Sequence, residues 1–383
     1  MIPRGIISAD GHVCEPPNCY VDFIDPKYRD DAPRIVEQPD GTEAFVVKGM
    51  KKPVALGFID GAGFGVRERL ERARRIRFSD IREAAYGGRA RLPYMDQDGL
   101  AAEIVYASVG MGLCMHREPD YKDACMQAYN RWLQSMCSEA PHRIFGLAQT
   151  AVLDVDSAMA DFRRAREMGM VGMMMPGDPV HEDYDHPDYD ALWECAVDLG
   201  LPICFHILTS RAGSLHTKPR GHALNNFLGI IRAVQDVVGL FVLGGVFERH
   251  PQLKLVVAES DVGWLPHYMY RMDHAAMINA EDGIINGLSK LPSEYVSSNV
   301  YATFQDDRTA FQSLHMIDHR HLLWASDFPH TDSTWPHSQQ LIAEQTGHLT
   351  EQQKQDILRD NTARVFNLPA GAESWRMSGE AVA

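Results

Sequence analysis

Short apolar runs alternate with longer amphipathic segments along most of this chain. The segments Asp120–Cys137 and Asp156–Met168 place apolar residues at helical spacing, and the second is followed by Gly169, a common helix stop. Eight apolar runs have the length and composition of buried strands, and they are centred near Ile7, Val105, Phe145, Met173, Cys204, Val256, Tyr301 and Leu323. Short apolar strands that alternate with helices predict a parallel sheet.

The number of strands favours one α/β architecture. Eight strands with helices between them predict a TIM (β/α)8 barrel, distorted and with an insertion after the first strand. Further helices are expected at His186–Leu199 and Phe227–Gly239, and a second helical piece reaches Phe247. A last helix opens at Thr350, where Gln353 has the position of a capping-box partner.

One barrel is expected over residues 1–383, with residues 17–88 as an insertion and residues 350–383 as a C-terminal helix and tail. We expect the insertion to be irregular. It contains a cluster of arginines at positions 67, 69, 72, 74, 75, 77 and 82. A solvated, charged helix would explain this cluster. Alternatively, the insertion is a lid, and an arginine such as Arg67 binds a substrate carboxylate through two hydrogen bonds.

Composition narrows the classes of function. The chain has 383 residues, of which 45% are hydrophobic, and a formal net charge of −15. A strongly acidic chain is a poor ligand for nucleic acids or anionic membranes, and the charge serves solubility. The first residues do not resemble a signal peptide, and a transmembrane run is missing. Seven cysteines without a C-x-x-C pair indicate free thiols in the cytoplasm, and the apolar share is compatible with a homodimer.

Residues able to bind a metal follow four of the predicted strands. Asp10 and His12 end the first strand, His206 the fifth, Glu259 the sixth and Asp327 the eighth. Active sites of barrel enzymes form at these carboxyl ends, and strand eight closes next to strand one. Residues i and i+2 of a strand point the same way, so Asp10 and His12 can face one point. Carboxylates and imidazoles suit zinc, manganese or iron.

Each of these residues also has a structural interpretation when it is taken alone. His206 can be a hydrogen-bonded core histidine, and Asp327 or Glu259 can cap a turn or helix. The joint pattern favours a metal site, because four strand ends that meet at one mouth carry suitable side chains. His250, in an Arg-His-Pro turn, is expected to be structural.

Longer motifs carry a resemblance to a known family. They are Asp10–Pro16 (DGHVCEP), Phe205-His206, Gly245–Lys254 (GVFERHPQLK), Trp324–His330 (WASDFPH) and Asn361–Phe366 (NTARVF). In this order they resemble the amidohydrolase superfamily, in the branch that includes aminocarboxymuconate semialdehyde decarboxylase and the resorcylate-type decarboxylases. The resemblance implies a site for one divalent metal, without an organic cofactor, on Asp10, His12, His206 and Asp327. It also implies that Asp327 is the catalytic acid/base.

One departure from that branch bears on the reaction. Its decarboxylases usually carry a histidine in a His-x-Gly context after strand six, whereas this chain has Glu259-Ser260-Asp261-Val262-Gly263. A glutamate would repel a substrate carboxylate unless it were protonated. We therefore expect a hydrolase in which a metal-activated water attacks a small carboxylated, aromatic or cyclic substrate. Asp327 would transfer the proton, and Glu259 would orient water or protonate the leaving group.

Two alternatives stay open. The same metal could serve non-oxidative decarboxylation of an aromatic or muconate-type acid, with Asp327 protonating the carbon. The barrel could also bind a metal without catalysis. Zinc is the expected metal, and manganese suits the same ligands. Candidates for contact with a small-molecule substrate are Arg67, Arg211 and His330.

Overall fold

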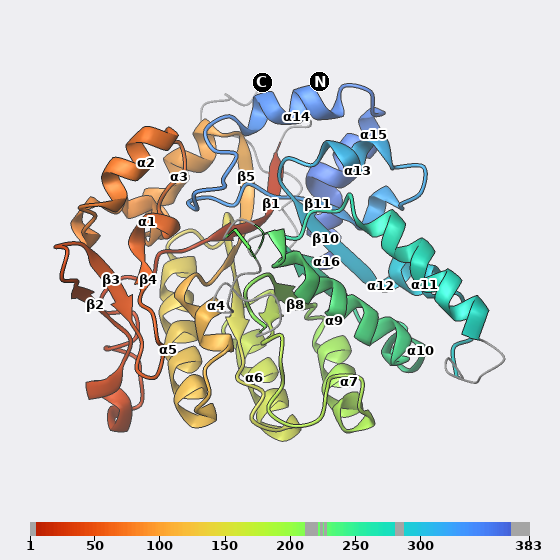
Figure 1. The fold of residues 1–383 in the computed structure, drawn as a ribbon, viewed down its shortest axis with the longest axis horizontal. Coiled ribbons are helices and arrows are strands. Elements are labelled where there is room, and N and C mark those ends of the chain that lie inside the picture. The colour runs from red at the N-terminus through yellow and green to blue at the C-terminus, as the bar shows by residue number, and fades with distance from the viewer. Residues whose placement is uncertain (1–4, 211–220, 223–224, 226–227, 280–286, 369–383) are drawn as a thin grey trace.

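The computed structural model describes residues 5–210, 221–222, 225, 228–279 and 287–368. Eight parallel strands form its centre (Figure 1). In sheet order, which is also chain order, they are β1 (Ile6–His12), β5 (Leu100–Tyr106), β6 (Ile144–Gln149), β7 (Gly172–Met174), β8 (Ile203–His206), β9 (Leu255–Ala258), β10 (Val300–Phe304) and β11 (Leu322–Trp324). Every residue of these strands is buried, which explains their continuous apolar runs. The eight strands predicted from the sequence are confirmed.

Backbone hydrogen bonds close the barrel between β1 and the segment that follows β11. The amide of Asp327 donates to the carbonyl of Asp10 over 3.0 Å, and the amide of His12 donates to the carbonyl of Phe328 over 2.7 Å. The two ends of the chain's barrel region therefore lie side by side. We refer below to this junction of β1 with residues 325–328 as the seam.

Helices cover the outside of the barrel (Figure 1). The longer ones are α3 (Gly88–Gln97), α5 (Pro119–Ser138), α6 (Val155–Glu167), α7 (Asp190–Leu199), α9 (Ile231–Leu243), α11 (Leu265–Asn279), α12 (Pro292–Asn299) and α14 (Ser338–Thr346). Short helices are α4 (Val109–Cys114), α10 (Val246–Arg249), α13 (Arg308–Gln312), α15 (Glu351–Gln355) and α16 (Asn361–Val365), and a π-helical turn, Asp356–Asp360, joins the last two.

Most predicted helices are present, with shifted ends. The helix predicted to stop at Gly239 continues to Leu243, and its predicted start at Phe227 lies outside the described residues. Gly239 lies inside the helix and is not its end. A glycine fits this position because a Cβ there would come within 2.6 Å of the hydroxyl of Tyr268. The helix predicted from His186 begins with a 3-10 turn and becomes α-helical at Asp190.

The segment after β1 is more regular than we expected. It contains a three-stranded antiparallel sheet of β2 (Arg34–Glu37), β3 (Glu43–Val46) and β4 (Val54–Ala55), followed by α1 (Leu56–Ile59) and α2 (Val66–Ala73). The expectation of an irregular insertion is wrong here, because strands of two to four residues are too short to show a period of two. None of the residues of α2 is buried, as in a solvated helix.

This segment contacts the loop that follows β11. The amides of Gly61 and Ala62 donate to the carbonyl of Pro329 over 2.9 and 3.0 Å. The guanidinium of Arg69 donates to the carbonyl of Thr331 over 2.8 Å. The segment thus reaches residues within four positions of Asp327.

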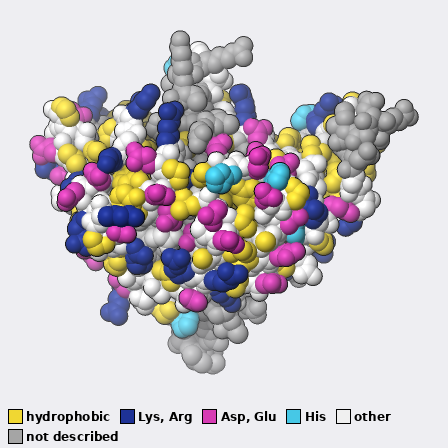
Figure 2. All heavy atoms as spheres, turned by 90° about the horizontal axis from the view of Figure 1, so that it is seen from below, with side chains coloured by type: hydrophobic (Ala, Val, Ile, Leu, Met, Phe, Trp, Pro, Cys, Tyr) yellow, Lys and Arg dark blue, Asp and Glu magenta, His cyan; other side chains and the backbone are white. Residues whose placement is uncertain are grey.

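On the face of the molecule shown in Figure 2, acidic and basic side chains are interspersed with apolar ones. Acidic side chains are spread over that face among basic ones, as solvated charges would be. Among the described residues, no helix has the length and apolar character needed to cross a membrane.

Candidate metal centre

Four side chains from three strands converge at the carboxyl end of the barrel. Asp10 and His12 end β1, His206 ends β8 and Glu259 directly follows β9, and ligand atoms of these four residues lie within 4.8 Å of one another. The Nε2 atoms of His12 and His206 are 3.1 Å apart. Nε2 of His12 is 3.4 Å from Oδ1 of Asp10, and Nε2 of His206 is 3.3 Å from Oε2 of Glu259.

A second group of ligand atoms overlaps the first. It consists of His12, Glu259, Asp327 and His330, again within 4.8 Å of one another. Oδ1 of Asp327 lies 3.5 Å from Nε2 of His12 and 3.1 Å from Nδ1 of His330. Of the four ligands that the resemblance implied, the first group contains Asp10, His12 and His206, and the second contains His12 and Asp327. Glu259 belongs to both groups, and His330 belongs to the second.

The backbone fixes the orientation of the two facing imidazoles. Nδ1 of His12 lies 3.2 Å from the carbonyl of Ala107, and Nδ1 of His206 lies 2.9 Å from the carbonyl of Ile207. Because a carbonyl only accepts, each Nδ1 carries the hydrogen, and in a neutral ring each Nε2 presents a lone pair. Although burial opposes it, the charges of Asp10 and Glu259 raise the pKa of His206, so in the metal-free fold a proton on its Nε2 can bridge to Nε2 of His12. A divalent cation in place of that proton would be bound by both nitrogens.

The carboxylates of the cluster also lack partners that a metal would supply. Oδ1 of Asp10 and both carboxyl oxygens of Asp327 are buried without a hydrogen bond. Burial raises the pKa of Asp10, and burial followed by the charges of Glu259 and Asp10 raises the pKa of Asp327. Buried carboxylates with raised pKa values indicate too little positive charge around them. The residues present therefore fit a divalent cation.

Two of these carboxylates stand on strained backbone. Glu259 has a φ of 53° and Asp327 a φ of 55°, in the left-handed region that residues with a side chain rarely adopt. Each such residue costs about 1 kcal/mol or more, and such strain concentrates at functional sites. Hydrogen bonds keep both in place. The amide of Glu259 donates to the hydroxyl of Thr303, which donates to Oδ2 of Asp10, and the amide of Asp327 donates to the carbonyl of Asp10.

His330 is held between Asp327 and Ser108. The hydroxyl of Ser108 lies 2.7 Å from the carbonyl of Val13 and 2.8 Å from Nε2 of His330. Its single hydrogen goes to the carbonyl, so Nε2 of His330 donates to the hydroxyl and Nδ1 faces Asp327. The ring also stacks on His12, with the ring centres 3.8 Å apart. Burial lowers the pKa of His330 to about 4, which favours the neutral ring.

Glu15 anchors the loop that carries Ser108. Its buried carboxylate accepts hydrogen bonds from the amides of Ser108, Val109 and Gly110 at 3.1 to 3.2 Å, at the start of α4. Glu15 belongs to the opening motif, but sequence reasoning gave it no role and did not consider Ser108. The only available signal was that Ser108 follows the second predicted strand.

The other candidate residues lie elsewhere. Arg67 does not reach the cluster, because its side chain is 94% exposed and pairs with Glu71 one helical turn away, at 3.0 Å. Arg211 lies outside the described residues. His250 contacts Asp190 at 2.9 Å, near the amino end of β9, as expected for a structural histidine.

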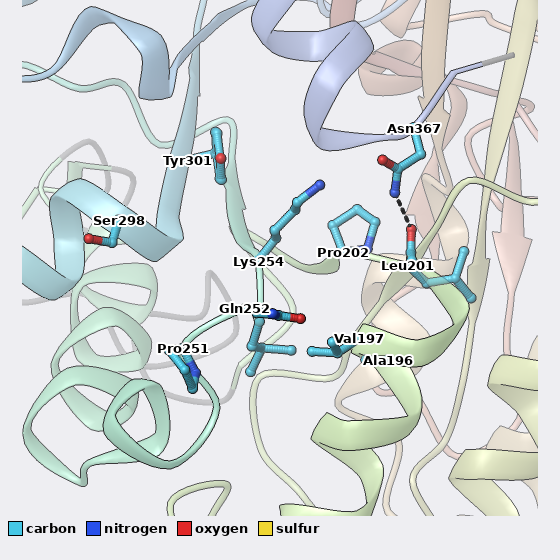
Figure 3. Close-up of a pocket in the computed structure, with 12 residues that line it drawn as sticks. Ala196, Val197, Leu201, Pro202, Pro251, Gln252, Lys254, Ser298, Tyr301 and Asn367 are labelled. Atoms are coloured by element: carbon cyan, nitrogen blue, oxygen red, sulfur yellow. Dashed lines mark hydrogen bonds between the residues drawn. The ribbon is translucent and has the colours of Figure 1, made fainter. Parts of the chain in front are cut away.

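A separate pocket of about 440 Å³ lies at the opposite end of the barrel (Figure 3). Its lining includes Pro202, Lys254 and Tyr301, which come just before or at the start of β8, β9 and β10. The ammonium of Lys254 donates to the carbonyl of Arg364 over 3.3 Å. Because the pocket is at the amino ends of the strands, it is remote from the metal centre.

The chain belongs to the amidohydrolase family, since the profile of the family described as Amidohydrolase (Amidohydro_2) matches residues 81–368. That range contains β5 to β11 and, of the cluster, His206, Glu259, Asp327 and His330. The family predicted from the motifs is thereby confirmed.

Comparison with known proteins gives relatives of two kinds. An amidohydrolase from Mycobacterium avium subsp. paratuberculosis K-10 has a TM-score of 0.77 at 20% identity, over 96% of this chain and 100% of the other. A 5-carboxyvanillate decarboxylase from Novosphingobium aromaticivorans, with bound manganese and 3-methoxy-4-hydroxy-5-nitrobenzoic acid, has a TM-score of 0.70 at 20% identity, over 95% and 97%. These likenesses show the fold.

A curated relative matches in sequence over a shorter stretch. The decarboxylase OrsB of Emericella nidulans is 29% identical over 148 residues, which are 34% of this chain and 42% of that protein. The chain thus aligns with less than half the length of this relative.

Proposed function

We propose that this protein is a metal-dependent hydrolase that uses an activated water to attack a small aromatic, cyclic or carboxylated substrate at an amide, lactone or carbon–carbon bond. The observation that carries the proposal is the carboxyl group of Asp327. It is buried, neither oxygen has a hydrogen bond, and Oδ1 is 3.5 Å from Nε2 of His12. Such a group is placed to exchange a proton with a water or a leaving group.

Asp10, His12, His206 and Asp327 would hold one divalent metal, and Glu259 is close enough to join them. When bound, the metal would polarise a substrate carbonyl and lower the pKa of water toward about 7. The family and the chemistry of the side chains support this assignment.

The protein's own residues would move the proton. Asp327 accepts it from the attacking water and returns it to the leaving group. Burial beside other carboxylates raises the pKa of Asp327, which makes it a stronger base than a solvated aspartate. Nδ1 of His330 lies 3.1 Å from Oδ1 of Asp327 and, with its lone pair, can accept a hydrogen bond from the carboxyl group of Asp327 once that group has taken up the proton. Although burial opposes it, His12 and His206 lower the pKa of Glu259, so this 16% exposed side chain stays ionised and suits orienting the water rather than protonating the leaving group.

Decarboxylation is the second candidate, and the named relatives favour it. One relative is called a decarboxylase, and another is a carboxyvanillate decarboxylase with manganese and a nitrobenzoic acid bound. In that reaction the protonated carboxyl of Asp327 would donate its proton to the ring carbon that carbon dioxide leaves. We place hydrolysis first because the carboxylate of Glu259 would face the substrate carboxylate.

One experiment separates these functions. The full chain, loaded with zinc or manganese, is incubated with hydroxybenzoates and, in parallel, with amides and lactones built on the same rings. We expect ring-opened or cleaved products without carbon dioxide. Carbon dioxide from a hydroxybenzoate would establish the decarboxylase instead. A fully loaded protein that turns over neither set would favour a barrel that binds metal without catalysis.

Replacing His330 by alanine is expected to lower kcat about 100-fold while the metal stays bound. The imidazole that accepts a hydrogen bond from the protonated carboxyl group of Asp327 would be lost, but His330 is not among the four proposed ligands. The measurement is steady-state kinetics together with metal content by elemental analysis. His337→Ala is the matched control, since His337 follows in the same loop with an exposed side chain. Unchanged kcat in His330→Ala would remove His330 from the proposed site.

Further assignments concern the metal, the substrate, the oligomeric state, the location and the lid. We propose zinc as the native metal, with manganese as the alternative, because the mixed ligands suit both. We also propose a small-molecule substrate, a homodimer, a cytoplasmic location, and a lid function for part of residues 17–88. The contacts of Gly61, Ala62 and Arg69 with the loop after β11 support the lid.

A further inference from the structure

A fully buried arginine spans the barrel seam. Arg91, on α3, has a relative exposure of 0%. Its Nη1 donates to the carbonyl of His12 over 2.9 Å, and its Nη2 donates to the carbonyl of Phe328 over 2.7 Å. Its Nε donates to Oε2 of Glu103, in the middle of β5, over 2.6 Å. One side chain therefore joins α3, β1, β5 and the segment after β11.

Two of the three carbonyls that Arg91 binds, those of His12 and Phe328, belong to the metal centre's backbone, and the third is that of Ala84, 3.2 Å from Nη1. His12 is itself a proposed ligand, and Phe328 follows the proposed ligand Asp327. A guanidinium is planar and presents its N–H groups in a fixed fork, so it sets the distance between two carbonyls bound on its two nitrogens. The guanidinium of Arg91 thus adds to the backbone hydrogen bonds of the seam in fixing the position of His12 relative to Asp327.

Glu103 fits beside the seam only because Gly11 lacks a side chain. A Cβ on Gly11 would come within 2.0 Å of Oε1 of Glu103. The same Oε1 accepts a hydrogen bond of 3.4 Å from the hydroxyl of Ser326, the residue before Asp327. The glycine between Asp10 and His12 therefore makes room for a carboxylate that contacts both sides of the seam.

A buried ion pair of this kind is a poor way to gain stability. The free energy needed to desolvate two charges is about as large as the attraction between them. Apolar residues of similar volume therefore often stabilise a fold better. The bonds made by Arg91 and Glu103 are directed instead at the residues that carry the proposed ligands. Groups that orient metal ligands in this way typically change metal affinity 10- to 100-fold when they are lost.

We propose that Arg91 and Glu103 are positioning residues that hold His12 and Asp327 at the separation a divalent metal needs. The inference rests on the proposed metal site. It predicts that the metal centre weakens when the pair is removed, even where the fold is kept.

The test measures metal affinity and thermal stability on the same proteins. Metal-free full chain and its Arg91→Met variant are titrated with Mn²⁺ and Zn²⁺ against a fluorescent chelator. We expect the variant to bind each metal about 10- to 100-fold more weakly. Gly11→Ala, which keeps every charge but pushes against the carboxylate of Glu103, is expected to weaken binding in the same direction.

Arg143→Met is the matched control. Arg143 also pairs with a carboxylate, Asp96, over 2.7 Å and donates to two carbonyls, those of Leu100 and Ala101. These contacts are at the amino end of β5, away from the metal centre. The control is expected to lose thermal stability and to keep its metal affinity.

A double variant separates positioning from folding. Arg91→Met with Glu103→Gln leaves no unpaired buried charge, so its thermal stability should recover relative to Arg91→Met alone. Its metal affinity should stay low, because the guanidinium that bridges the carbonyls of His12 and Phe328 is still absent. If affinity recovers together with stability, or if Arg91→Met binds metal as the wild type does, the positioning proposal is wrong. If the wild type itself binds neither metal, the proposed function is wrong as well.

Discussion

Asp327→Asn is expected to reduce turnover by about 1,000-fold or more, because an amide cannot accept and return a proton. The substitution keeps the shape of the side chain, and Asp327 is fully buried, so the barrel should be preserved. Steady-state kinetics on metal-loaded protein measure the effect. It is expected for hydrolysis and for decarboxylation alike, since both proposals route the proton through this carboxyl group.

The same variant gives a second, independent readout in thermal stability. The pKa of Asp327 in the metal-free fold is raised, so the fold binds this proton more tightly than the unfolded chain does. Stability is then full below the unfolded pKa of about 3.9 and is lost as the pH rises through the higher folded value. Metal-free Asp327→Asn should therefore melt above metal-free wild type at pH 7, and the difference should vanish near pH 3.

Adding metal should reverse that order, because a carboxylate binds a divalent cation better than an amide does. Asp161→Asn serves as the control for replacing a buried aspartate. Asp161 bonds to Thr150 and Gln127, and its pKa is raised to about 6 by burial, so the neutral amide is a fair substitute. Its turnover should stay within about twofold. Retained turnover in Asp327→Asn would exclude the proposed acid/base.

The strands and the positions of the candidate ligands could be predicted because they follow from local rules. A strand buried on both faces is largely apolar, and the first polar residues after it mark the mouth of the barrel, as at His206, at Glu259 and at Ser326-Asp327. Both features, the apolar run and the polar residue after it, can be recognised from residues that are neighbours in the sequence. The barrel's closure then places the strand ends together without further information.

The supporting contacts could not be predicted, because they join residues far apart in the chain. Arg91 lies in a helix among other charged residues, and only the fold shows that it is buried against His12 and Phe328. The cluster of arginines in the sequence pointed to Arg67 as a functional residue instead, but its side chain faces solvent. Likewise, the residues around Ser108 show no sequence pattern that predicts its hydrogen bond to His330, 222 positions away.

Removing His12 or His206 is expected to abolish the stabilisation that metal gives. A metal present at about 100 times its Kd should stabilise the wild type by about 2.7 kcal/mol. For a chain of this length that corresponds to a rise of about 3 °C in melting temperature. Each alanine variant loses one of the two Nε2 donors that face each other at 3.1 Å, so its metal affinity should fall more than about 100-fold.

Melting curves of metal-free proteins with and without added zinc or manganese measure this effect, and elemental analysis gives the metal content. His250→Ala is the control, because its imidazole contacts Asp190 and is not part of the cluster. It should melt at a lower temperature but keep the full rise on adding metal. If His12→Ala and His206→Ala keep the rise as well, the metal binds elsewhere. The cluster would then need another explanation for its facing Nε2 atoms and unpartnered carboxylates, which is why this pair of variants bears most directly on the site.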